Sequence, residues 1–122
     1  MSSDEYLAAV DRRLAELAHV LIASTFQREI DANLGLGLVQ GRLTFMDGSS
    51  RTFSEQLPTE RRKYRLHSMD ARQQLIARWD SAPRHPELST FPHHKHTPAG
   101  AEASNPGTLL EILDAVIAHL LI

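Results

Sequence analysis

Residues 61–80, RRKYRLHSMDARQQLIARWD, decide the fold, because two runs of alternating side chains flank a short polar turn. The first run, 61–69, places basic side chains on one side and apolar side chains on the other. The second run, 74–80, alternates in the same way. Side chains alternate across a β-strand, so this pattern predicts an antiparallel hairpin closed by residues 70–73, with one apolar and one polar face.

The hydrophobic pattern also predicts how the two strands pair. The register that collects the apolar side chains on one face has these pairs: Tyr64–Trp79, Leu66–Ala77, Arg65–Arg78, Lys63–Asp80 and His67–Ile76. Two arginines directly opposite each other repel unless an anion lies between them. The polar face therefore predicts a phosphate site that includes Arg65 and Arg78.

The flanking sequence extends this hairpin in both directions. Apolar residues at helical spacing and two capping boxes predict helices at both ends, and two-residue alternation predicts further strands. The predicted helices are 4–18 and 108–121, and the other predicted strands are 22–31, 38–46 and 51–57. Prolines make 81–106 a Pro/His-rich loop. We expect a single α+β domain over residues 1–122, an antiparallel sheet of about four to five strands with the N- and C-terminal helices packed on one face.

Composition narrows the class of protein. The chain of 122 residues has no cysteine, which excludes disulfides, thiolate zinc sites and cysteine nucleophiles. No apolar run reaches the roughly 18 residues of a membrane span, and the start of the chain lacks the pattern of a signal peptide. We therefore expect a cytoplasmic protein with no membrane association.

Charge is distributed unevenly along the chain. The segment 61–96 carries eight basic and three acidic residues, whereas 1–60 has a net charge of −4 and 97–122 of −3. Arginine outnumbers lysine by 11 to 2, and arginine binds phosphate through two parallel hydrogen bonds. This indicates an anionic partner, with RNA or DNA first, unless the arginines pair with acidic groups within the fold.

The polar face of the hairpin has the composition of a phosphodiester-cleaving site. His67 is a candidate general acid or base, and Asp80 would orient a neighbouring histidine or arginine. Lys63, Arg65 and Arg78 would bind phosphate and stabilise charge in the transition state. The alternative is an exposed sheet face with ion pairs.

A second group of candidates lies in the predicted loop, which contains FPHHKH at 91–96. The candidate catalytic residues there are His85, His93, His94 and His96, and Lys95 joins the phosphate-binding set. The pattern favours a metal-free role, so no cofactor is expected. Zinc bound by His85, His94 and His96 is the alternative, although the spacing matches no standard metal motif; a solvated loop is the third possibility.

Three strings resemble the TumE-like proteins, toxins of toxin–antitoxin systems: GRLTFMDGSSRTFSE, ERRKYRLHSMD and LIARWDSAPRHPELSTFPHHKH. The resemblance covers nearly the whole chain. Arg84 stands where the family has histidine, and Leu66 and Trp79 stand where it has tyrosine. The resemblance implies a toxin encoded beside a DNA-binding antitoxin, for which we expect a helix-turn-helix protein.

Together these observations predict a toxin that acts on RNA or another phosphate-bearing target, with metal-independent, ribonuclease-like activity. Two other functions stay open: a non-enzymatic module that binds nucleic acid or a partner, and a metal-dependent hydrolase that uses the histidine loop. A homodimer is compatible with the sequence.

Overall fold

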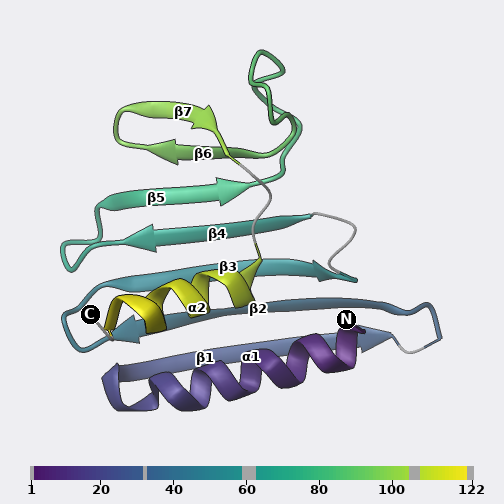
Figure 1. Cartoon of the computed structure of the whole chain (residues 1–122), viewed down its shortest axis with the longest axis vertical. Helices are drawn as coiled ribbons and strands as arrows, with labels where there is room; N and C mark the ends of the chain where they lie inside the picture. The colour runs from purple at the N-terminus through teal and green to yellow at the C-terminus, as the bar shows by residue number, and fades with distance from the viewer. Residues whose placement is uncertain (1, 32, 59–62, 105–107, 121–122) are drawn as a thin grey trace.

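The computed structural model describes residues 2–31, 33–58, 63–104 and 108–120. The elements are α1 (Ser3–Leu17), the 3₁₀-helix η1 (Ala18–Val20), β1 (Leu21–Asp31), β2 (Leu36–Phe45), β3 (Ser50–Leu57), β4 (Tyr64–Met69), β5 (Leu75–Asp80), β6 (His94–Thr97), β7 (Gly100–Ala103) and α2 (Leu109–Leu120). Each strand pairs antiparallel with the next one in the chain, so the sheet is a meander from β1 to β7 (Figure 1). The predicted α+β class is confirmed, but the sheet has seven strands rather than four to five.

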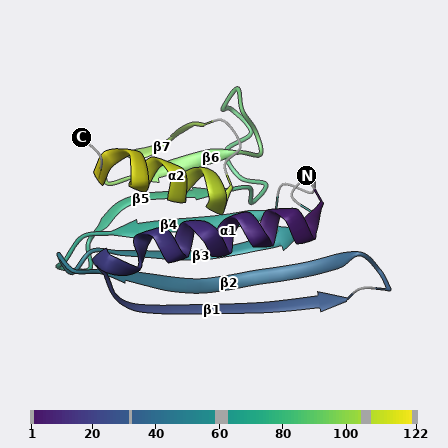
Figure 2. The same cartoon turned by 60° about the horizontal axis from the view of Figure 1, so that its bottom comes forward.

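Both helices cover the same face of the sheet, as predicted (Figure 2). The core lies between the helices and this face, and its members are almost fully buried. Val10 and Leu17 of α1 meet Val39 and Leu43 of β2 there, together with Leu113 of α2. Burial of these apolar side chains is the main force that holds the helices on the sheet.

The first helix begins where its capping box predicts. The Ser2 hydroxyl accepts a hydrogen bond from the Glu5 backbone at 3.1 Å, and the Glu5 carboxylate accepts one from the Ser2 backbone at 3.4 Å. These two bonds satisfy amide groups that have no partner within the helix.

The second helix begins after a similar cap, since the Thr108 hydroxyl accepts a hydrogen bond from the Glu111 backbone at 3.2 Å. Leu109 and Leu113 are each only 1% exposed, so α2 packs on the sheet. None of the described helices is long and apolar enough to cross a membrane.

The β4–β5 pairing keeps the predicted faces but not the predicted partners. The pairs are Arg65–Asp80, Leu66–Trp79, His67–Arg78, Ser68–Ala77 and Met69–Leu75. The shift has two causes: a bulge in β5 at Ile76, which is skipped between the pairs Ser68–Ala77 and Met69–Leu75, and a turn one residue longer than expected. The Asp70 carboxylate holds this longer turn, because it accepts backbone hydrogen bonds from Arg72 and Gln74 at 2.8 and 3.0 Å. Beyond the bulge the two single-residue shifts add to an even number, so residues 64–68 and 77–80 stay on their predicted faces. Between the turn and the bulge only one shift applies, so Leu75 lies opposite Met69 on the polar side, and its predicted place beside Ala77 and Trp79 is wrong.

The prediction of a loop over 81–106 is wrong for residues 94–103, which form the β6–β7 hairpin. Prolines argued against strands there, because proline has no amide hydrogen for the ladder. However, Pro92 precedes β6 and Pro98 lies in the turn between β6 and β7, where no ladder bond is lost. Strands of four residues are too short to give an alternation signal in the sequence.

Candidate functional site

The sheet face opposite the helices carries the polar side chains of three neighbouring strands. We call it the open face, and its central residues are Arg65, His67, Arg78, Asp80, His94 and His96. The strand pairing arranges them in two rows: Arg65–Asp80–His94 and His67–Arg78–His96. The β6 strand, which the sequence did not predict, therefore brings two histidines of the FPHHKH string beside the basic hairpin.

Asp80 is the buried acidic group of this face, with 3% of its surface exposed. One carboxylate oxygen, Oδ1, lies 2.9 Å from Nε2 of His94 and accepts a hydrogen bond from the Ala82 backbone at 3.0 Å. The other, Oδ2, lies 3.4 Å from Nε of Arg78. Asp80 thus neutralises part of the positive charge of the face, and the predicted direct Arg65–Arg78 and Lys63–Asp80 pairs are not formed.

His67 occupies the centre of the cationic part of the open face. It lies across from Arg78 on β5, and Arg65 is two residues away on the same face of β4. Desolvation lowers the pKa of His67, and the charges of Arg78 and Arg65 lower it further. All three effects favour the neutral imidazole, which is the form that accepts a proton.

Two hollows adjoin these residues. One, of about 390 Å³, is lined mainly by the polar side chains Gln27, Gln40, Thr52, Ser54, Arg65 and His67. The second, of about 310 Å³, shares Ser54 and Arg65 and extends to Lys63 and Ser81. Arg65 lies where the two hollows meet, so a polar chain laid along them would pass over its guanidinium group.

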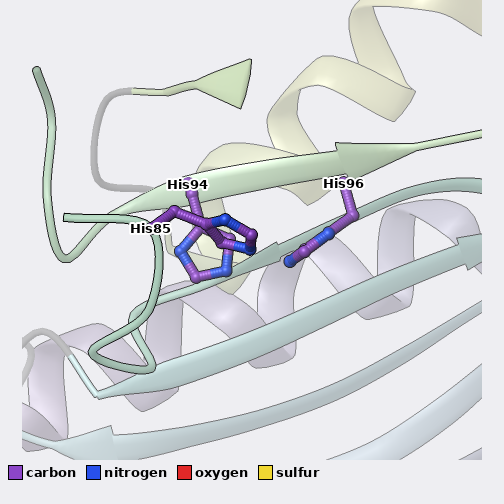
Figure 3. A group of neighbouring side chains, drawn as sticks. All are labelled: His85, His94 and His96. Carbon is purple, nitrogen blue, oxygen red and sulfur yellow. The ribbon is translucent and has the colours of Figure 1, made fainter. Parts of the chain in front are cut away.

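A histidine cluster, His85, His94 and His96, forms the third part of the site (Figure 3). One ring nitrogen from each residue lies within 4.8 Å of the others. His94 and His96 project from the same side of β6, and His85 reaches them from the loop after β5. The sequence predicted these three residues as a set, but only the tertiary structure brings His85 to the strand.

Other predicted residues lie elsewhere. Lys95 points to the helix-covered face, since side chains alternate along β6, and its ammonium lies 5.3 Å from the centre of the Trp79 ring. His93 stacks on Tyr64, whose hydroxyl lies 3.0 Å from His93 Nδ1. The structure therefore separates His93 and Lys95 from the open-face residues.

Arg42 also lies on the open face, although no pattern in the sequence indicated it as a site residue. Its strand position, opposite Thr52, puts its side chain on the open face, where it donates a hydrogen bond to the Gln73 side chain at 3.1 Å. Its alternation against Val39 and Leu43 already separates it from the core. The missing information was the strand order, which places β2 two strands away from the hairpin.

Comparison with known proteins identifies a family. The family model described as toxin TumE matches residues 10–121, nearly the whole chain. No curated protein and no solved structure matches the chain.

Proposed function

Because the chain belongs to the toxin TumE family, which supports a toxin role and implies a cognate antitoxin, we propose that it acts on RNA through the open face. The observation that carries the proposal is the position of His67, whose imidazole lies near Arg78 and Arg65 at the edge of a polar hollow and whose pKa is lowered by desolvation and by both charges. Arg65 and Arg78 bind the phosphate, and His67 accepts the proton of the attacking hydroxyl group as its oxygen forms a bond to phosphorus. The bond from phosphorus to the leaving oxygen breaks, and that oxygen takes a proton from water.

The proposed site has both groups that phosphodiester cleavage needs. Charge builds up on the phosphoryl oxygens in the transition state, and guanidinium groups stabilise it. A base whose pKa lies below the working pH is already unprotonated, so it can accept the proton of the nucleophile. Asp80 holds Arg78 through their 3.4 Å contact, so we assign it a positioning role.

For the antitoxin, we propose a helix-turn-helix protein encoded by a neighbouring gene. Among the described residues, four of the six large exposed apolar side chains lie on or near the β1–β2 hairpin: Ile22, Ile30, Leu34 and Met46. Leu109 and Leu113 of α2 are buried in the core, so we do not assign the antitoxin to that side of α2.

The test is inducible expression in a bacterial host, with growth and total RNA integrity followed over time. Wild-type protein should arrest growth and fragment RNA, and His67→Ala and Arg65→Ala should lose roughly 10²-fold or more of the cleavage rate. Arg72→Ala and His19→Ala are matched controls, because each removes the same residue type from an exposed position outside the open face.

Growth arrest with intact RNA would exclude the nuclease mechanism and keep the toxin role. The non-enzymatic binding module predicts a different pattern: Arg65→Ala would lose RNA affinity, and His67→Ala would change nothing. Soluble wild-type protein that leaves growth unaffected would contradict the proposed activity itself.

A further inference from the structure

The histidine cluster has the geometry of a metal site. In a tetrahedral zinc site the ligand nitrogens lie about 2.1 Å from the metal and therefore about 3.4 Å from one another. The cluster nitrogens lie within 4.8 Å of one another, so small side-chain rotations bring them to that separation. The ring centres are equally close, between 4.7 and 5.4 Å.

The hydrogen bonds of His94 direct one nitrogen into the cluster. Its Nδ1 lies 2.9 Å from the Pro92 carbonyl oxygen, which only accepts, so Nδ1 carries the hydrogen. Its Nε2 lies 2.9 Å from the Asp80 oxygen Oδ1, but it makes no hydrogen bond of acceptable geometry among the described residues. A buried imidazole nitrogen and a carboxylate oxygen therefore face each other at the edge of the cluster, in position to share one bound cation.

The other two histidines have matching features. Nε2 of His96 is also buried without a hydrogen-bond partner within the described parts of the chain. His85 Nδ1 lies 3.3 Å from the Glu87 carboxylate, which leaves its Nε2 available. Metal-binding histidines characteristically bind a carbonyl or carboxylate through the nitrogen that does not hold the metal.

The backbone at His85 lies in the left-handed region. Its φ angle is +57°, a conformation that only a few per cent of residues other than glycine adopt, with asparagine, aspartate and histidine enriched among them. Such strained positions concentrate at ligand-binding sites. Here the conformation belongs to the loop residue that joins the two histidines of β6.

We propose that His85, His94 and His96, with Asp80 as the fourth ligand, bind one divalent transition-metal ion, for which zinc is the best fit. Imidazole nitrogens favour zinc over magnesium or calcium, which prefer oxygen. His94 is 1% and Asp80 3% exposed, and the burial suits a closed, four-ligand site that fastens the loop after β5 to β6. This proposal does not depend on the proposed activity on RNA.

The test uses full-length protein without a histidine tag, stripped with a chelator and titrated with Zn²⁺, with metal content measured by mass spectrometry. We expect one zinc ion per chain, and a tetrahedral visible spectrum when Co²⁺ replaces zinc. His85→Ala and His96→Ala should each weaken zinc binding by more than about 100-fold, beyond the usual effect of removing an outer partner. Asp80→Asn should weaken it as well.

His93→Ala is the matched control, since it removes a neighbouring histidine that lies outside the cluster. Zinc should raise the thermal midpoint of wild type and of His93→Ala, but not of His85→Ala, whose loop position permits folding. Binding below one ion per chain, or equal binding by His85→Ala and wild type, would overturn the proposal. Unchanged binding by Asp80→Asn would overturn the assignment of the fourth ligand.

Discussion

Replacing Glu55 should destabilise the fold strongly, because this buried carboxyl group connects the sheet to both helices. It is 3% exposed on β3, under the helices. One oxygen accepts a hydrogen bond from the Tyr6 hydroxyl of α1, and the other accepts one at 3.1 Å from the Leu109 backbone at the start of α2. The predicted perturbation is Glu55→Ala.

The magnitude follows from these two bonds. A hydrogen bond to a charged group contributes roughly 1.5–3 kcal/mol, and each buried donor left without a partner costs about 1–3 kcal/mol. These two figures describe partly the same loss, so they are not added in full for each bond. We expect Glu55→Ala, which removes both bonds, to lower the free energy of unfolding by about 3–5 kcal/mol. Tyr6→Phe removes the bond to Glu55 and the acceptor of the Leu110 backbone amide, and it should cost about 1.5–3 kcal/mol.

The assay is urea denaturation followed by circular dichroism, with Glu102→Ala as the control. Glu102 forms an exposed ion pair with Lys95 at 3.8 Å, and such a pair contributes at most about 1 kcal/mol. If Glu55→Ala does not fold, Tyr6→Phe still measures the link to α1. A loss below about 1 kcal/mol for Glu55→Ala would refute the reasoning.

Glu55 also affects how stability depends on pH. Burial raises its pKa above the ordinary value of 4.5, although the bonds from Tyr6 and Leu109 oppose the rise. The unfolded state therefore loses this proton first, so the contribution of Glu55 is present below pH 4.5 and is lost as pH rises through the raised pKa. Denaturation midpoints of wild type relative to Glu55→Gln should fall over this range, and a constant difference would contradict the assignment.

Three further predictions test other parts of the structure. The pKa of His67, measured by NMR titration, should lie below 6.5 and should rise in Arg78→Gln, because the charge of Arg78 lowers it more than the charge of Arg65 does. An unchanged pKa in Arg78→Gln would argue against the proximity of Arg78 and His67. Gly41→Ala should destabilise the fold by about 2–3 kcal/mol in urea denaturation, because its new carbon would lie 2.1 Å from the Thr25 carbonyl oxygen; a neutral effect would contradict this packing. The salt dependence of RNA affinity should lose about one phosphate contact in Arg65→Ala, and an unchanged slope would place the contact elsewhere.

The sequence was informative where patterns are local. Capping boxes at Ser2 and Thr108 marked both helix starts, and alternation assigned the faces of residues 64–68 and 77–80 correctly. There the face assignment survived the error in register, because a two-residue shift leaves a side chain on its side. The partners of Arg65 and His67, and the face of Leu75, could not be predicted, since they depend on the bulge at Ile76 and the turn held by Asp70.

Glu55 illustrates a group that the sequence could not identify. Its alternation with Phe53 puts it on the buried face, where a carboxyl group is costly unless it is hydrogen-bonded. Its partners, Tyr6 and Leu109, lie 49 and 54 residues away. No local pattern connects them.

By itself, the sequence determined the α+β class, both helices and five of the strands. It also determined that a basic hairpin is followed in the chain by a segment rich in histidine. These follow from periodicity, capping and charge, which act over a few residues. The tertiary structure alone decided that β6 joins β5, and so brings His94 and His96 to Asp80 and His85. That pairing depends on backbone hydrogen bonds between distant segments and on a four-residue strand, neither of which leaves a periodic signal in the chain.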